Sequence, residues 1–332
     1  MNREQALVLA TAAGEAVRGT TSPNPPVGCV VLDADGELVG TGATAPPGGP
    51  HAEVVALARA GERARGGTAV TTLEPCNHTG RTGPCSVALV TAGIAHVHYA
   101  AADPTPQAAG GAAHLRAAGV TTSTTGTDPA PLRAWLHRQR TGRPHVTWKL
   151  AASLDGRTAA VDGTSRWITG PQARAQVHAE RARVDAIVVG TGTALADDPA
   201  LTARHPDGTL AGHQPLRVVV GHRPLPAGAQ LLDDTAVTLL LDTHDPHAVL
   251  AALTDHPDVL LEGGATLAGA FAAAGLLDRV VAYVAPVLLG AGPAALGDAG
   301  VGTIARALRF EVESVELVGA DVRLVLGPAE RG

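Results

Sequence analysis

The sequence predicts an α/β protein of two domains. Short apolar runs alternate with helical patterns from the N-terminus to about residue 120, as in strands and helices packed in layers. Apolar runs resume at residue 145 and end in an alternating hairpin pattern around Gly319-Ala320. The length of 332 residues also favours two hydrophobic cores over one.

The first half begins with a helical pattern over residues 2–18, where apolar residues recur at helical spacing. A strand over 27–33, a hairpin signal at Asp35-Gly36 and a returning strand over 37–41 follow. The remaining elements expected are a helix over 52–64, a strand over 68–73, a helix over 84–92, a strand over 95–101 and a short helix over 132–140. We interpret the Thr-, Gly- and Pro-rich segment 121–131 as a break.

The domain boundary is expected near Gly142, which gives domains of residues 1–143 and 144–332. The second half is expected to hold buried strands over 145–150, 185–189, 216–220, 237–241, 259–261 and 280–285. A helix is expected over 265–274, and a hairpin over 311–318 and 321–326.

Composition excludes several classes of protein. The net charge of −6, the aromatic content of 2% and the lack of a Lys/Arg run argue against a nucleic-acid partner. No uncharged apolar stretch reaches the roughly 18 residues of a membrane span, and the N-terminus has no secretory pattern. Three cysteines cannot build a disulfide framework, so we expect a cytoplasmic protein.

One set of residues has the pattern of a catalytic metal centre. His51-Ala52-Glu53 is followed by Pro75-Cys76 and, nine residues after Cys76, by Cys85. One imidazole and two thiolates suit zinc and leave its fourth position open for water, whose pKa the metal lowers to about 7. Glu53, in the first helical turn beside His51, is placed to take the proton of that water. This is the signature of the zinc nucleobase deaminases.

Each part of the set also has an ordinary interpretation. A lone His-x-Glu is usually a solvated helix start, and a lone Pro-Cys usually has no function. The order of the parts, with a strand before the cysteines, favours a zinc site. Cys29 lies inside an apolar strand and is interpreted as a small core residue.

The motifs of the first half resemble those of the bifunctional RibD family of riboflavin biosynthesis. They are Asn24-Pro25, Val27-Gly28, His51-Ala52-Glu53 and the segment from Leu73 to Cys85, whose long loop between the cysteines includes His78-Thr79-Gly80-Arg81-Thr82. The resemblance covers essentially the whole chain. It implies a cytidine-deaminase-like α/β/α domain followed by a dihydrofolate-reductase-like α/β domain.

For the first domain, the resemblance implies a role for six residues. His51, Cys76 and Cys85 hold one zinc ion, and Glu53 passes the water proton to the leaving amine. Asn24 binds the substrate, and Arg81 lies near its phosphate. Two of these residues have alternatives, an Asx-turn for Asn24 and a solvated loop charge for Arg81. The chain departs from the family at Thr44, where a histidine is usual.

Residue patterns alone say less about the second half. No Gly-x-Gly-x-x-Gly follows its first strand, so a Rossmann cofactor site is not indicated. The Gly-rich turns at 190–193 and 262–264 suit either close approach to a phosphate or a plain turn. The segments 149–157, 165–169 and 195–204 resemble the RibD reductase domain, which uses NADPH.

The resemblance divides the expected reductase residues into two groups. The NADPH-binding group is Ala151, Trp167, Thr169, Thr193, Asp197 and Gly264. The substrate-binding group is Lys149, Ser165, Arg181, Leu201, Arg204 and Glu262. Ordinary surface positions are the alternative for the two arginines, and a core position is the alternative for Trp167. Lys149 is the only lysine of the chain, and Gly221-His222 replaces the family's usual Asp-Ser.

The expected function is therefore in riboflavin biosynthesis. The first domain would deaminate 2,5-diamino-6-(ribosylamino)pyrimidin-4-one 5′-phosphate, and the second would reduce the ribosyl group to ribityl with NADPH. We expect this phosphorylated aminopyrimidine as the partner, no nucleic acid, no membrane, and a homo-oligomer (dimer or tetramer). The alternative is a RibD-like paralogue with altered or lost deaminase specificity. A nucleic-acid-editing deaminase is opposed by the charge, and a non-catalytic zinc module by Glu53.

Overall fold

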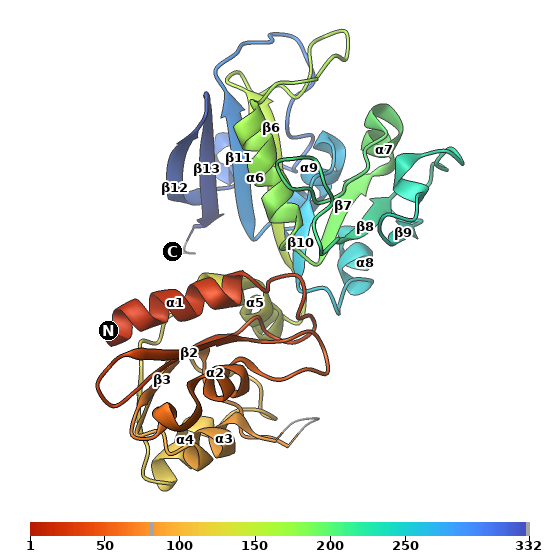
Figure 1. Ribbon diagram of the computed structural model, residues 1–332. Coiled ribbons are helices and arrows are strands. Elements are labelled where there is room, and N and C mark those ends of the chain that lie inside the picture. Colours follow the sequence, from red (N-terminus) through yellow and green to blue (C-terminus); the bar gives the residue numbers. More distant parts are fainter. Residues whose placement is uncertain (80–82, 330–332) are drawn as a thin grey trace. The chain divides into compact units, whose positions relative to one another are not determined.

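The computed structural model describes residues 1–79 and 83–329 (Figure 1). The chain forms two compact units, Met1–Arg143 and Pro144–Gly332. Among the described residues, every helix is too short or too polar to cross a membrane.

The first unit contains a five-stranded sheet in the order β2-β1-β3-β4-β5. Strand β1 is antiparallel to β2 and β3, whereas β3, β4 and β5 are parallel. In chain order its elements are α1 (Arg3–Glu15), β1 (Gly28–Leu32), β2 (Leu38–Ala43), α2 (Ala52–Ala60), β3 (Thr68–Leu73), α3 (Cys85–Thr91), β4 (His96–Ala101), α4 (Gly111–Ala117), β5 (Thr121–Thr124) and α5 (Arg133–Thr141).

Alternate residues of β1 face two different layers of helices. Val30 and Leu32 pack with residues of α1, whereas Cys29 and Val31 pack in the core that includes α2 and α3. Because successive side chains of a strand point to opposite faces, the sheet lies between helices. The α/β/α prediction for this unit is confirmed, and Cys29 is a fully buried core residue as expected.

Close packing of α2 on β2 determines where the first turn of that helix lies. A side chain at Gly40 would meet the carbonyl oxygen of Ala56 at 2.2 Å, and one at Gly42 would meet that of Ala52 at the same distance. Only glycine permits this approach. The N-terminus of α2, which carries His51 and Glu53, is thereby fixed against the sheet.

The interpretation of 121–131 as a break is wrong for its first four residues. Thr121–Thr124 forms the edge strand β5, paired in parallel with β4. Threonine favours extended backbone, and so short a strand has too few residues for an alternating pattern. The helix expected over 52–64 ends as an α-helix at Ala60, and Gly61–Ala64 continues as a 3₁₀ turn.

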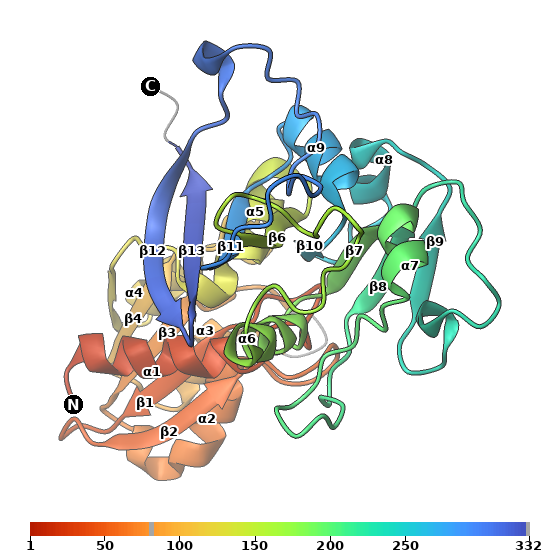
Figure 2. The same cartoon turned by 90° about the horizontal axis from the view of Figure 1, so that it is seen from above.

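The second unit contains an eight-stranded sheet in the order β12-β13-β11-β6-β10-β7-β8-β9. The six strands from β11 to β9 are parallel, and β12 and β13 form an antiparallel ribbon at one edge (Figure 2). Its elements are β6 (His145–Ser153), α6 (Pro171–Arg181), β7 (Ala186–Gly190), α7 (Thr191–Asp197), β8 (Leu216–Val220), β9 (Thr238–Leu241), α8 (Pro246–Ala251), β10 (Asp258–Leu261), α9 (Ala265–Ala273), β11 (Arg279–Ala285), β12 (Phe310–Val318) and β13 (Asp321–Pro328).

Helices cover both faces of this sheet. Residues of α8 and α9 pack on one face, in a core that includes Val188 of β7. On the other face, Ile187 and Val189 of β7 lie in a second core, and α6 packs on β11 and β13 in a third. The α/β prediction for this unit is confirmed. Three helices, α6, α7 and α8, had no expected counterpart. Charged residues interrupt the apolar pattern of α6, and α7 and α8, with seven and six residues, are too short for a helical period to stand out.

Candidate active sites

Three elements bring together one histidine and two cysteines in the first unit. His51 caps the N-terminus of α2, Cys76 follows β3, and Cys85 is the first residue of α3. The Nδ1 atom of His51 lies 3.6 Å from the Cys76 sulfur and 3.4 Å from the Cys85 sulfur. The ligand atoms of the three residues all lie within 4.8 Å of one another.

These distances fit a tetrahedral zinc ion. With Zn–S of about 2.3 Å and Zn–N of about 2.0 Å, a tetrahedral angle separates nitrogen from sulfur by about 3.5 Å. Three protein ligands leave one position for water, the arrangement of catalytic sites. Cys76 and Cys85 are both buried, which suits thiolates held by a metal.

The loop that carries Cys76 is fastened at both ends. The backbone N–H of Cys85 donates to the Cys76 sulfur at 3.4 Å. The buried carboxylate of Glu74 accepts from the backbone N–H of Ala112 at 2.9 Å, in the first turn of α4. A side chain at Gly111 would come within 1.7 Å of the Pro75 carbonyl oxygen, so α4 lies directly against this loop. The sequence patterns indicated no role for Glu74, although it lies in the family-like segment from Leu73 to Cys85.

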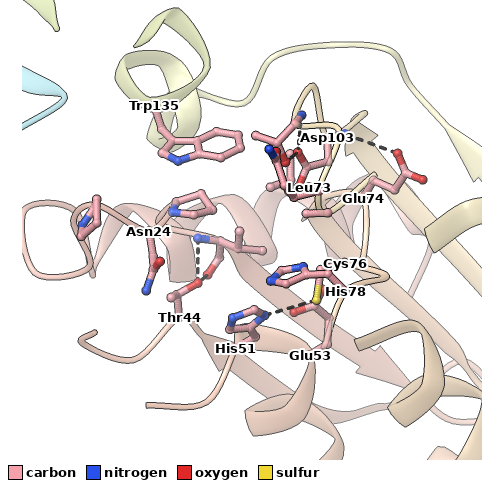
Figure 3. A pocket seen from close by; sticks show the side chains of 16 residues that line it. Asn24, Thr44, His51, Glu53, Leu73, Glu74, Cys76, His78, Asp103 and Trp135 are labelled. Atoms are coloured by element: carbon pink, nitrogen blue, oxygen red, sulfur yellow. Dashed lines mark hydrogen bonds between the residues drawn. The ribbon is translucent and has the colours of Figure 1, made fainter. Parts of the chain in front are cut away.

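Glu53 lies in the first turn of α2, beside the candidate metal ligands (Figure 3). Only 4% of the residue is exposed. Burial raises the pKa of its carboxyl group to about 7, since desolvation disfavours the charged form. A buried carboxyl beside an open metal position is placed to exchange a proton with water bound there.

A cavity of about 300 Å³ opens beside this centre. Asn24 and Glu53 line it as expected, and Trp135 of α5 lies across the cavity from His51 (Figure 3). The volume suits a small heterocyclic substrate. Lining residues for which the sequence analysis assigned no role are Glu74, His78, Asp103, Thr105, Gln107 and Trp135. His78 lies in the quoted segment from Leu73 to Cys85, whereas no local signal marks Trp135.

Thr44, the departure from the family pattern, also lines this cavity. Its hydroxyl accepts a hydrogen bond from the Val27 backbone N–H at 3.1 Å, and the residue is 4% exposed. The side chain is therefore occupied with the strand backbone. The substrate-binding prediction for Arg81 lies outside the described residues.

A second cavity, of about 580 Å³, lies in the second unit. Eleven of the twelve residues expected for the reductase line it, namely Lys149, Ala151, Ser165, Trp167, Thr169, Arg181, Thr193, Asp197, Leu201, Arg204 and Glu262. The twelfth, Gly264, caps α9, and a side chain there would meet the Thr193 hydroxyl at 2.9 Å. Residues that the sequence analysis missed include Arg174, His178, Gln230 and Tyr283.

A buried carboxylate between two cations lines the second cavity. Glu262 accepts two hydrogen bonds from the Arg181 guanidinium, at 2.6 and 2.9 Å, and its carboxylate lies 3.7 Å from the Lys149 ammonium. Burial opposes ionisation of Glu262, but the charges of Arg181 and Lys149 outweigh it and lower its pKa to about 2. Burial lowers the pKa of Lys149 from its ordinary value. Arg181 is a partner of Glu262 and not an ordinary surface arginine.

Trp167 stands at the rim of this cavity and is 68% exposed. The alternative of a core position is wrong for this residue. The guanidinium carbon of Arg174 lies 4.5 Å from the centre of the indole ring, and that of Arg166 lies 5.9 Å away. Such contacts hold an aromatic face toward a cation, and an exposed indole offers a flat surface for a planar ligand.

One wall of the cavity is the loop that follows α7. Leu201 has a φ of +49°, and its side chain is buried in the core below, so its backbone faces the cavity. The carbonyl oxygen of Thr202 accepts from the His178 imidazole at 3.1 Å and from Arg181 at 3.3 Å. Its hydroxyl accepts from Arg204 at 3.0 Å. These bonds connect α6 with the loop.

The departure at Gly221-His222 follows β8. Gly221 has a φ of +132°, and a side chain there would meet the Thr191 hydroxyl at 2.5 Å, at the start of α7. His222 pairs with Asp242 and packs edge-on against His244, with ring centres 4.4 Å apart. Glycine is thus required by the packing of this loop against α7.

Two family models match the chain. Residues 2–101 match the cytidine and deoxycytidylate deaminase zinc-binding region, which supports zinc at the first centre. Residues 144–324 match the RibD C-terminal domain.

Curated proteins and solved structures agree with these models over nearly the full length. The riboflavin biosynthesis protein RibD of Mycobacterium tuberculosis is 55% identical over 327 residues, which cover 97% of this chain and 96% of that protein. RibD of Escherichia coli is 41% identical and covers 98% of this chain and 99% of its own. A structure of Acinetobacter baumannii RibD aligns with a TM-score of 0.85 at 38% identity, covering 99% of this chain and 98% of that one. A deaminase/reductase from Thermotoga maritima aligns with a TM-score of 0.89 at 28% identity, covering 98% and 99%. The chain belongs to the RibD family of riboflavin biosynthesis proteins, which join a zinc-dependent deaminase to an NADPH-dependent reductase.

Proposed function

We propose that residues 1–143 deaminate 2,5-diamino-6-(ribosylamino)pyrimidin-4-one 5′-phosphate and that residues 144–332 reduce the ribosyl group of the product to ribityl. The observation that carries the first half is the buried Glu53 beside His51, Cys76 and Cys85, at the edge of a cavity. The full-length similarity to a protein named as this deaminase and reductase supports the pairing of the two reactions.

In the deaminase, His51, Cys76 and Cys85 would hold zinc. Zinc, when bound, lowers the pKa of a water ligand to about 7 and so supplies a nucleophile at neutral pH. Glu53 accepts the proton of the attacking water and returns it to the leaving amine, which departs as ammonia. Asn24 fixes the pyrimidine by hydrogen bonds, and Trp135 excludes water from the opposite side of the cavity. Arg81 is proposed to pair with the phosphate.

In the reductase, NADPH supplies the hydride that reduces C1′ of the ribose. The proposed cofactor residues are Ala151, Trp167, Thr169, Thr193, Asp197 and Gly264. The proposed substrate residues are Lys149, Ser165, Arg181, Leu201, Arg204 and Glu262. Arg204 suits the phosphate or the sugar hydroxyls. Lys149, held by Glu262, presents a compact cation that steadies the ring-opened ribose.

The proposal is tested by mass spectrometry of the products formed from the aminopyrimidine, with and without NADPH. Without NADPH, the expected product has lost one amine as ammonia and keeps its ribosyl group. With NADPH, the product should gain two further hydrogens on the sugar. Zinc-loaded protein that releases no ammonia would contradict the deaminase assignment and favour a paralogue of altered specificity.

We further propose a cytoplasmic homo-oligomer, either a dimer or a tetramer. The edge strand β12 exposes Val312, Val315 and Leu317 by 60% or more. An apolar edge strand is usually covered by another chain, and a second copy is the occupant proposed here. The three free cysteines are consistent with a reducing compartment. Light scattering at micromolar concentration tests the assembly, and a monomer would contradict it.

A further inference from the structure

Arg217 is a fully buried arginine below the wall of the reductase cavity. It lies in β8 with none of its surface exposed. Burying an unpaired guanidinium costs free energy, and the hydrogen bonds of Arg217 to the surrounding chain offset that cost. Its side chain is not part of the cavity lining, and sequence analysis assigned it no role.

The terminal nitrogens of Arg217 donate hydrogen bonds to two stretches of chain. One nitrogen donates to the Ala200 carbonyl at 3.3 Å, to the Gln230 carbonyl at 3.2 Å and to the Asp233 carboxylate at 2.8 Å. The other donates to the backbone carbonyls of Asp233, at 2.8 Å, and Ala236. A single side chain therefore ties the loop after α7 to the segment between β8 and β9.

The loop that Arg217 holds has an unusual backbone. Asp198 and Leu201 adopt φ values of +40° and +49°, and no other non-glycine residue in the described part of the chain has a positive φ. Left-handed backbone costs free energy for such residues and persists only where surrounding contacts enforce it. Gln230 adds two of these contacts, because its backbone N–H donates to the Asp198 carboxylate at 2.9 Å and its amide donates to the Asp198 carbonyl at 2.6 Å.

We propose that Arg217 is a positioning residue for the reductase: it holds the loop Asp198–Thr202 in the left-handed form that presents the Leu201 backbone and Arg204 to the substrate. The role rests on the proposed placement of the substrate in this cavity. The cofactor residues Thr193 and Asp197 lie in α7, before the held loop. Loosening the loop should therefore affect the substrate more than NADPH.

The test uses two variants of the full-length protein. Arg217→Lys keeps the charge but cannot reach all the acceptors at once. Asp233→Ala removes one acceptor at an exposed position outside the cavity lining. Asp298→Ala is the matched control, because Asp298 is an exposed turn carboxylate that accepts from the Gly300 N–H without an arginine partner. Deaminase turnover reports the folding of the first unit, and the Kd for NADPH reports the folding of the second.

The expected result is a rise of about tenfold or more in KM for the ribosylamino substrate in Arg217→Lys, and a smaller rise in Asp233→Ala. The Kd for NADPH and the deaminase rate should change by less than about twofold. Hydrogen exchange of the backbone amides of Asp198 and of residues 200–202 should accelerate in both variants and not in the control.

A purely structural role predicts a different outcome, in which active enzyme is lost in proportion to folded protein while KM stays unchanged. That result, or unaltered exchange in the loop, would overturn the positioning role. Wild-type protein that fails to reduce the substrate would instead contradict the proposed function. The exchange experiment would still report whether Arg217 holds the loop.

Discussion

Glu262 accepts two hydrogen bonds from the Arg181 guanidinium, although the two residues are 81 positions apart in the chain. The Glu262 carboxylate is buried, and the Lys149 ammonium lies 3.7 Å from it. One negative charge thus faces two positive charges, so the cluster that lines the cavity carries a net positive charge. An anionic substrate is favoured in such a place.

Glu262→Gln should destabilise the second unit, because Lys149 and Arg181 would remain as two partly buried cations without a carboxylate. We expect the free energy of unfolding at pH 7 to fall by about 3 kcal/mol, the lower end of the range for broken buried ion pairs, because both cations keep some contact with solvent. Urea unfolding monitored for this unit measures the change. Glu316→Gln, which removes an exposed partner of Arg323, is the control and should cost under about 1 kcal/mol.

The stabilisation by Glu262 should also depend on pH. Its pKa is depressed from the ordinary value of 4.5 to about 2, so the contribution is fully present above pH 4.5 and is lost as pH falls through about 2. The difference in stability between wild type and Glu262→Gln should therefore narrow between those two values. A difference that stays constant down to pH 2.5 would show that charge is not the cause.

Glu53→Gln should abolish deamination and keep the metal. The amide preserves the size of the side chain but cannot accept the proton of water, a contribution of about 10²–10⁴ in rate. Ammonia release measures the loss, and elemental analysis measures zinc. Reduction of the already deaminated substrate should remain at the wild-type rate, which serves as the internal control. Retained ammonia release would remove Glu53 from the mechanism.

Cysteine substitutions should separate the metal ligands from the core residue. Cys85→Ala is expected to lose zinc and deaminase activity together, since two ligands bind the ion far more weakly than three. Cys29→Ala is the matched control, because Cys29 is equally buried but lies in the core of β1. It should keep one zinc per chain. Equal zinc content in the two variants would contradict the assigned ligand set.

The deaminase site was more predictable than the reductase site for a physical reason. His51 and Glu53 share one helical turn, and the two cysteines flank one loop. The spacing of these residues in the sequence is therefore enough to predict that they lie close together. The reductase cavity instead combines Lys149 of β6, Arg181 of α6 and Glu262 after β10. The order of the strands in the sheet brings these three residues together. Before the structure, only the resemblance to the family indicated that they belong to one site.

Some residues and elements of the two units had no recognisable signal in the local sequence. Trp135 comes from α5, the helix that follows the edge strand β5 in the chain, and Arg217 appears in the sequence as one charge at the start of an apolar strand. The role of each depends on packing between segments distant in sequence. The edge strand β5 was missed because four threonine-rich residues carry no alternation of polar and apolar side chains.

Thr44→Val should destabilise the first unit by about 1 kcal/mol. The change keeps the shape of the side chain but removes one of the two acceptors of the buried Val27 N–H, which also donates to the Pro25 carbonyl oxygen at 2.9 Å. Because the hydroxyl bonds to the strand, the KM for the aminopyrimidine should change little. Thermal unfolding followed through zinc release measures the stability. Thr44→Ser retains the hydroxyl and should behave like wild type, and a large rise in KM for Thr44→Val alone would indicate direct substrate contact.

Trp167 should report NADPH binding through its fluorescence. The chain has three tryptophans, and Trp135 and Trp148 are 5% and 8% exposed, against 68% for Trp167. Iodide should therefore quench mainly Trp167, and a cofactor that covers the indole should protect it. Trp167→Phe should remove most of the iodide-sensitive emission and weaken NADPH binding by about 1 kcal/mol, roughly fivefold, because a smaller ring offers less contact to the cofactor and to Arg174. Unchanged iodide quenching at saturating NADPH would place the cofactor away from this rim of the cavity.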